Sequence, residues 1–322
     1  MGWNRIFDKR AVLTVAVLFS NFFLSFDATA GSGPTYAFLK AETGARAAAL
    51  AGSFVSVTND PNGIFYNPAS LFTVEGKRGS FGFFKHLLDI NGGNLSYTQE
   101  IEDVGRFGAG IIYLNYGDFA ETDESGNELG SFGAADLAAL VGYSARIEEN
   151  LFWGVNLKFV YSSIAGYHST GAAIDAGILF TIPEQRVTLG VSVRNLGMQL
   201  NSYLETRESM PVELTAGGSI VPKGLPLLLN VNFHFRDEEV DSFGDRFRGF
   251  TIGGEFTLSR VVQLRFGYDN ALRKDLKLGT TPGLAGFASG LGINVQGFTV
   301  DYAITLLGSI GNLHRVSLST PL

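Results

Sequence analysis

The sequence predicts an all-β protein, an antiparallel transmembrane β-barrel of about fourteen strands with an N-terminal hatch segment inside its lumen. Apolar and polar residues alternate along many short runs, as they do on the two faces of a strand. The connections between these runs alternate in length, which is typical of outer-membrane barrels. After residue 30, no stretch of about 18 apolar residues offers a membrane-spanning helix. We therefore divide the chain into a signal peptide at 1–30, a hatch or plug at 31–75 and a barrel at 76–322.

Residues 1–30 have the three parts of a secretory signal peptide. Arg5, Lys9 and Arg10 give a positive start, and an apolar run follows at 11–24. The segment 28–30, Ala-Thr-Ala, is a small-x-small cleavage site. The alternative, an uncleaved anchoring helix, needs about 20 apolar residues, which this run does not supply. We expect cleavage near Ala30 and export to the outer membrane of a Gram-negative-type bacterium.

The sequence of residues 31–75 does not predict a β-strand. An alanine-rich piece at 45–51 precedes two turn clusters at 59–63 and 67–69, and these are rich in Asn and Pro. Such residues favour compact, irregular structure. A fourteen-stranded lumen is wider than its own side chains fill, because about eight strands already give a packed interior. We expect this segment to fold back and plug the lumen.

The barrel strands follow from the period of two. In the run 229–236, every odd residue is apolar and every even residue is polar, whereas a helix would scatter these residues around its surface. The predicted strands are 77–88, 91–102, 105–117, 133–147, 150–166, 170–183, 186–196, 210–221, 226–236, 246–258, 261–270, 284–294, 297–307 and 312–319. An even number of strands lets the sheet close and removes both free edges.

The connections and the aromatic residues fit a membrane barrel. Tight turns at 102–104, 148–149, 184–185, 223–225, 259–260 and 295–297 alternate with longer loops at 118–132, 196–209, 237–245 and 271–283. Aromatic side chains near strand ends are expected in the two interfacial girdles. These candidates are Tyr113, Tyr116, Trp153, Tyr161, Tyr268 and Tyr302. The alternative is that they are ordinary core residues of a soluble β protein.

Polar residues on the inward faces are the candidate lumen lining. They are Lys158, Arg194, Asn230, Asn232, Arg236, Glu255, Arg265 and Asp301. Buried charges need partners, so we expect these residues to pair with one another and with the hatch, where Arg46 is a candidate. A substrate path between hatch and wall remains the alternative.

The composition and the motifs argue against an enzyme. The chain has no cysteine, which excludes disulfides, thiolate metal sites and a thiol nucleophile. It lacks the nucleophile-elbow and phosphate-loop patterns, and its four histidines lie far apart in sequence. His234 is expected to be a solvated lumen residue. We therefore predict no catalytic site, no cofactor and no metal centre, and the net charge of −7 predicts no nucleic-acid partner.

Two acidic loops leave one question open. The segments 118–128 and 237–245 are rich in Asp and Glu, but neither has the spacing of an EF-hand. We interpret them as solvated loop tips, with calcium binding as the alternative.

The segment 38–71, FLKAETGARAAALAGSFVSVTNDPNGIFYNPASL, resembles the N-terminal signature of the PorV/PorQ (UPF0164) family, which belongs with the FadL-type outer-membrane barrels. The residues that carry the resemblance, and that it assigns to the hatch, are Gly44, Arg46, Asn67, Pro68 and Ala69. Weaker matches follow in order at 175–177, 195–197, 254–255, 264–268, 301–303 and 314–318. The resemblance implies a fourteen-stranded barrel with a hatch in its lumen. The chain departs from many such barrels at its end, Thr320-Pro321-Leu322, where an aromatic residue is common.

The resemblance implies two functions. Similarity to PorV implies a non-enzymatic outer-membrane component of protein secretion, which receives exported cargo proteins and passes them to a surface-attachment complex. Similarity to FadL implies passive transport of long-chain fatty acids or other hydrophobic molecules, with the hatch shifting to open a lateral exit. The signature favours the secretion function, with hydrophobic transport as the alternative. The expected partners are outer-membrane lipid and either secreted proteins or a hydrophobic ligand.

Overall fold

A computed structural model describes residues 35–85, 90–236, 247–276 and 283–322. The predicted signal peptide, the residue His86 and the whole predicted loop 237–245 lie outside these ranges. The side chain of Arg236 lies outside the description as well, although its backbone ends a strand. Among the described residues, no helix has both the length and the apolar character needed to cross a membrane.

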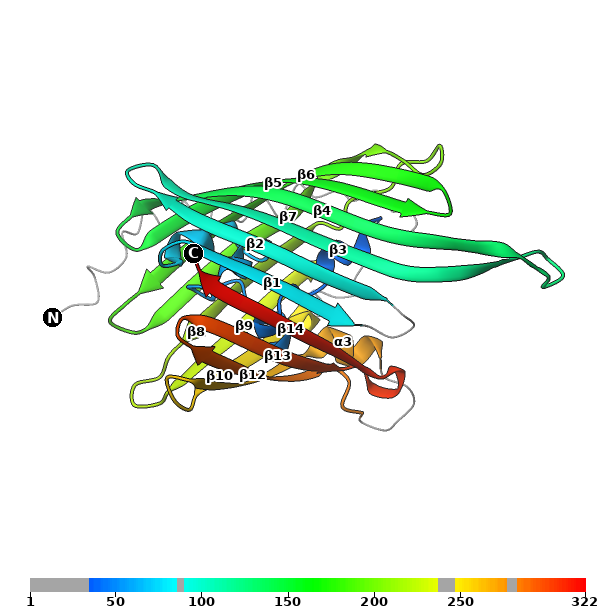
Figure 1. The fold of residues 1–322 in the computed structure, drawn as a ribbon. Helices are drawn as coiled ribbons and strands as arrows, with labels where there is room; N and C mark the ends of the chain where they lie inside the picture. Colours follow the sequence, from blue (N-terminus) through cyan, green and yellow to red (C-terminus); the bar gives the residue numbers. More distant parts are fainter. Residues whose placement is uncertain (1–34, 86–89, 237–246, 277–282) are drawn as a thin grey trace. The chain divides into compact units, whose positions relative to one another are not determined.

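Fourteen antiparallel strands form a closed barrel, in which each strand pairs with its neighbours in sequence and β1 pairs with β14 (Figure 1). The strands are β1 (Arg78–Lys85), β2 (Asn91–Ile101), β3 (Gly105–Thr122), β4 (Glu128–Glu148), β5 (Leu151–Ile164), β6 (Tyr167–Ile182), β7 (Val187–Asn201), β8 (Glu213–Ile220), β9 (Leu227–Arg236), β10 (Phe250–Thr257), β11 (Val262–Asp269), β12 (Phe287–Val295), β13 (Phe298–Leu306) and β14 (Asn312–Pro321). The predicted fold class and the predicted number of strands are therefore confirmed.

The hatch, here residues 35–75, contains short helices only. These are η2 (Ala37–Lys40), α2 (Ala45–Ala49), η3 (Pro61–Phe65) and η4 (Pro68–Thr73). The last two begin in the same way, because Asp60 and Asn67 accept hydrogen bonds from the backbone two residues later and Pro61 and Pro68 occupy the first helical position. Figure 1 shows this segment, in blue, inside the ring of strands. Two further short helices, α3 (Asn270–Asp275) and η6 (Gly308–Ile310), lie in connections between strands.

The two ends of the barrel differ. The turns 102–104, 149–150, 183–186, 221–226, 258–261 and 296–297 lie at the end that also holds the start of β1 and the end of β14, which we call the short-turn end. The opposite, long-loop end holds the connections 202–212, 237–249, 270–286 and 307–311. Two connections at this end, 123–127 and 165–166, are also short. The first is shorter than predicted because β3 and β4 extend further than predicted, and the second agrees with the short connection predicted there.

The predicted loop at 118–132 is wrong. β3 and β4 continue through it and form a two-stranded ribbon that reaches past the neighbouring strands (Figure 1). Phe119 stacks on Phe132 across the ribbon, with ring centroids 5.5 Å apart. At the tip, the carboxylate of Asp123 accepts hydrogen bonds from the backbone of Ser125 and Asn127, which closes a tight turn. Local pairing therefore replaces the expected solvated loop.

The outer and inner faces of the barrel differ in composition. Large apolar side chains point outward and remain exposed, as Leu157 and Val141 do at 60% exposure each. Most predicted girdle residues share this outward face, but Tyr116 does not. Its side chain packs against the core, and its hydroxyl donates to Asp136 at 2.7 Å. No described residues form a layer over this exposed apolar face. Such an arrangement is expected of a face that contacts lipid.

Candidate functional site

The hatch fits the barrel because many inward positions are glycine. A methyl group on Gly154 would lie 2.4 Å from the carbonyl carbon of Pro68, and one on Gly190 would lie 2.3 Å from the carbonyl oxygen of Val55. The other glycines whose missing side chain makes room for hatch atoms are Gly108, Gly110, Gly142, Gly171, Gly177, Gly253, Gly267 and Gly290. Close approach of the hatch backbone explains Gly154, Gly190, Gly253 and Gly267, and side chains of the hatch take the space at the others. Leucine and phenylalanine side chains of the hatch then fill the lumen, and Leu50 and Phe54 are completely buried.

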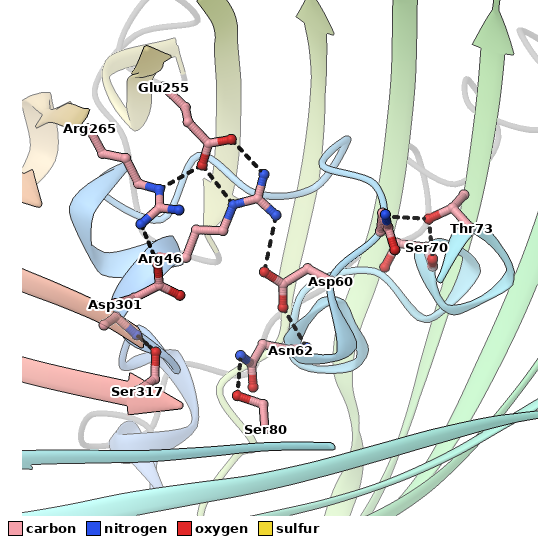
Figure 2. Close-up of polar contacts among 12 residues, drawn as sticks. Arg46, Asp60, Asn62, Ser70, Thr73, Ser80, Glu255, Arg265, Asp301 and Ser317 are labelled. Carbon is pink, nitrogen blue, oxygen red and sulfur yellow. Dashed lines mark hydrogen bonds and ion pairs between the residues drawn. The ribbon is translucent and has the colours of Figure 1, made fainter. Parts of the chain in front are cut away.

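Five side chains form a chain of alternating charge between the hatch and β10, β11 and β13 (Figure 2). Arg46 on α2 donates to Glu255 at 2.8 and 2.9 Å and to Asp60 of the hatch at 3.1 Å. Arg265 donates to Glu255 and to Asp301 at 2.6 Å each. Burial opposes the charge of Arg46, but the carboxylates of Glu255 and Asp60 outweigh it and raise its pKa. We call these five residues the charge chain.

The remaining predicted hatch residues position the segment. Gly44 precedes α2 with a φ of +84°, a conformation that favours glycine, and it lies against the side chain of Asn62. Asn67 donates to the carbonyls of Val55 at 2.8 Å and of Ile178 on β6 at 3.1 Å. Pro68 starts η4, and the carbonyl of Ala69 accepts a hydrogen bond from Ser144 on β4. Each of these residues therefore contacts the hatch itself or the wall.

A second polar cluster lies on β5, β6 and β7. Lys158 contacts Asp175 at 3.0 Å and Asn195 at 2.5 Å. A shift in the pairing of β6 and β7 opposite Asp175 turns both Arg194 and Asn195 inward, as β-bulges do. Because of the bulge, the backbone N–H of Asn195 also donates to Asp175.

Arg194 connects this cluster to the hatch. Its guanidinium donates to the carbonyl of Phe65 at 2.9 Å, pairs with Glu213 and lies over the ring of Tyr66. Burial raises the pKa of Tyr66, so its hydroxyl stays protonated and donates to the carbonyl of Thr43. His234 faces the lumen as predicted, but it is bonded to Glu213 and Thr251 and only 10% exposed, so the expectation of a solvated histidine is wrong.

The predicted wall residues Asn230 and Asn232 also face inward, and the side chain of Arg236 lies outside the described residues. The amide of Asn232 contacts the carbonyl of Gly52. Asn230 is completely buried, and neither of its amide atoms has a hydrogen-bond partner among the described residues. Asp60, Asp175 and Glu213 were not predicted as charge partners. Asp175 could have been found, because it is the one charged residue in the inward row of β6.

An apolar cluster lies at the long-loop end of the lumen. There the hatch residues Tyr36, Phe38 and Leu39 pack in one core cluster with inward wall residues. The wall members nearest this end are Phe84, Ile112, Leu114, Met210, Leu307 and Leu313, with Val212, Leu272 and Leu276 partly buried against them. We call this group the upper apolar cluster. The hatch is therefore mostly apolar toward the long loops, where Glu42 and Arg315 form an ion pair at 3.1 Å beside Phe84, and it carries the charge chain toward the short turns.

Hollows lie both on the outer face of the barrel and between the hatch and the wall. One, of about 330 Å³, lies on the outer face of β1, β2 and β3, where Gly93 leaves a gap between Phe83 and Tyr113. Two others lie between hatch and wall at the short-turn end. A recess of about 270 Å³ adjoins the charge chain, and one of about 250 Å³ lies between Val57 and the ends of β6 to β9. Thr58 lines both of these inner recesses.

Metal binding finds no support in the described part of the chain, where no three His, Asp or Glu side chains are grouped to hold an ion. At the ribbon tip, Asp123 uses both carboxylate oxygens for hydrogen bonds with Ser125 and Asn127. The second acidic loop, 237–245, lies wholly outside the described residues, so the alternative of calcium binding there stays open.

Neither a protein-family profile nor a curated protein matches the chain. The resemblance to the PorV/PorQ family therefore stays a prediction. Solved structures do match in fold. A deletion mutant of TodX, described as a monoaromatic hydrocarbon channel, superposes with a TM-score of 0.61 at 16% identity over 87% of this chain and 99% of that one.

Two further channels match at similar levels. The toluene transporter TbuX of Ralstonia pickettii gives a TM-score of 0.58 at 13% identity, over 86% of this chain and 96% of that one. A Pseudomonas aeruginosa homologue of FadL gives 0.57 at 10% identity, over 87% and 98%. At such low identity these matches establish the barrel fold that the chain shares with them.

Proposed function

We propose that this chain is a non-enzymatic outer-membrane β-barrel that passes hydrophobic small molecules from the long-loop side toward the short-turn side. The observation that carries the proposal is the upper apolar cluster, in which buried apolar side chains of the hatch and the wall pack together at the long-loop end of the lumen. Apolar surface at a mouth favours entry of apolar solutes, because their burial releases them from water.

The orientation and the location belong to the same proposal. Outer-membrane barrels place short turns in the periplasm and long loops outside, which makes the long-loop end external. The exposed apolar face of the wall supports insertion into lipid. Cleavage of the signal peptide near Ala30 is part of this proposal. The titles of the matched channels name toluene, monoaromatic hydrocarbons and a FadL homologue, and these support the choice of hydrophobic cargo.

Protein secretion, which the PorV resemblance implies, is the weaker candidate. The described lumen is filled by the hatch, and the matched structures described above are a hydrocarbon channel, a toluene transporter and a FadL homologue. The expected cargo proteins and attachment complex therefore remain predictions from the sequence signature alone.

The two functions can be separated in one host. Uptake of radiolabelled toluene or oleate is measured in a Gram-negative strain with an intact outer membrane, with and without the gene, alongside the inventory of surface-attached proteins. The proposal predicts faster uptake with the gene and an unchanged inventory. Unchanged uptake together with loss of surface-attached proteins in the deletion strain would select secretion instead.

A further inference from the structure

One buried carboxylate differs from the others in its partners. The buried Asp and Glu residues in the described part of the chain are Asp60, Asp136, Asp175, Glu213, Glu255 and Asp301. All of them except Asp136 form ion pairs with arginine, lysine or histidine side chains. Asp136 is 8% exposed and forms no ion pair with any described residue. Buried charges normally have a partner of opposite charge, so an ionised Asp136 lacks a counter-charge from the described chain.

Asp136 lies at the long-loop end of the lumen. It is the outermost buried residue in the inward row of β4, which continues through Ala138 and Leu140 toward the short-turn end. In register it pairs with Leu114 on β3 and with Ser162 on β5. Ala138, Leu140 and Leu114 all belong to the buried core cluster. The carboxylate therefore adjoins apolar surface at the mouth of the barrel.

Hydroxyl groups are the hydrogen-bond donors to this carboxylate within the described structure. Tyr116 donates to Oδ2 of Asp136 at 2.7 Å, and Ser162 donates to Oδ1. The hydroxyl of Tyr203 donates in turn to Ser162. An ionised carboxylate has about four acceptor positions, so each oxygen of Asp136 keeps a position for a further N–H donor.

Three tyrosine side chains from different parts of the chain lie near Asp136. Tyr116 comes from β3 just beyond the point where pairing with β2 ends, Tyr203 from the connection between β7 and β8, and Tyr36 from the hatch. Burial raises the pKa of Tyr36 and of Tyr203, and the negative charges of Asp136 and Glu208 raise both further. The tyrosines therefore stay neutral. Tyr116 and Tyr203 are only half-buried, and the faces of such rings attract cations.

From these observations we infer that Asp136, Tyr116 and Tyr203 form a binding site for a primary ammonium group attached to an apolar body. The ammonium group donates to the carboxylate, and the apolar body lies against the upper apolar cluster. A carboxylate-bearing molecule would instead be repelled by Asp136 and Glu208. The inference rests on the proposed function for the direction of entry, and it adds a preference for positively charged molecules at the mouth.

The first experiment compares three head groups on similar bodies. Radiolabelled 2-phenylethylamine is added to the purified full-length barrel in a non-ionic detergent, and its binding is measured by equilibrium dialysis. The unlabelled competitors are 2-phenylethylamine itself, the neutral 2-phenylethanol and the anionic 3-phenylpropanoate. The amine is expected to compete about tenfold better than either of the others, because hydrogen bonds to charged groups are stronger than those between neutral groups.

The second experiment changes the site. Asp136→Asn keeps the size of the side chain but removes its charge, and it should weaken binding of the amine about tenfold. Asp118→Asn makes the same change at an exposed position of the β3–β4 ribbon and should leave the affinity unchanged. Tyr203→Ala removes a ring from a connection outside the strands, so it tests the site even where Asp136→Asn disturbs folding. It should weaken binding about threefold.

Equal competition by 2-phenylethanol would mean that Asp136 is uncharged in the barrel, and it would overturn the inference. Unchanged affinity in Asp136→Asn and Tyr203→Ala would overturn it as well, and so would displacement of the probe by calcium chloride as effective as that by the unlabelled amine. Uptake of toluene in the same variants separates this outcome from failure of the proposed function. A barrel that takes up toluene without binding the amine refutes only the site, and one that binds the amine without taking up toluene refutes only the proposed function.

Discussion

Arg46 is the residue on which the position of the hatch depends most directly. It bridges Asp60 of its own segment and Glu255 of the wall, so one side chain fastens both ends of a loop to the barrel. Removal of one member of a buried ion pair leaves the other charges without compensation.

Arg46→Ala should therefore loosen the hatch. The expected loss is about 3 kcal/mol of stability in the hatch–wall contact, because Asp60 stays buried without its cation and Glu255 keeps only Arg265. Leakage of a small polar solute from liposomes that contain the barrel should rise several-fold. Arg260→Ala, on an exposed turn, is the control. Leakage equal to that of the unmodified barrel would mean that residues 35–75 do not seal the lumen.

The inward glycines lead to a second prediction, which concerns the packing of the hatch against the wall. Gly154→Val would place its side chain against the backbone of Pro68, an overpacking that costs about 1–3 kcal/mol. The hatch should become more sensitive to added protease, while the barrel keeps its strands. Gly283→Ala, where no atom lies closer than 4.0 Å, is the matched control. Equal protease sensitivity of the two variants would contradict the close packing of the hatch against Gly154.

The sequence predicted which side chains face inward but not which residues they contact. Alternation places Lys158, Arg265 and Asp301 on one face, because the period of a strand is two. Pairing depends on register and on bulges, and the bulge that turns Arg194 and Asn195 toward Asp175 leaves no mark in the alternation. The orphaned Asn230 was equally hidden for this reason.

At the scale of elements, the β3–β4 ribbon shows where pattern and structure diverge. Its polar, acidic sequence predicted a loop. The stacked pair Phe119–Phe132 and the turn at Asp123 instead stabilise two paired strands. Short local contacts suffice here because the ribbon continues strands that the barrel already fixes. The other strands were predicted well because one face of each meets the hatch and the other meets lipid.

Phe119→Ala should weaken the ribbon and nothing else. Loss of the ring stack costs about 1 kcal/mol, so backbone amides at 117–133 should exchange with deuterium faster, by several-fold. Amides of β5 and β6 serve as the internal control and should keep their protection. Unchanged exchange in the ribbon would show that the stack does not support it, and faster exchange throughout would show that ribbon and barrel are one cooperative unit.

At the scale of the whole molecule, closure of the sheet satisfies every strand edge, which is the condition for a sheet that meets lipid on its outer face. The apolar residues that a soluble protein would hide are turned outward, and polar residues and glycines are turned toward the hatch. Strand count and closure were predictable because each depends on a repeated pattern. The route of a solute through the lumen could not be predicted, because it depends on how one irregular segment, the hatch, packs against the wall.

The most direct test of this account is the migration of the purified protein in a denaturing gel, with and without boiling, together with its solubility without detergent. A closed barrel with a lipid-facing surface should need detergent to stay in solution. The unboiled sample should migrate differently from the boiled one, because the intact barrel resists unfolding by the gel detergent. A protein that stays dissolved in plain buffer and gives the same band in both lanes would contradict the account.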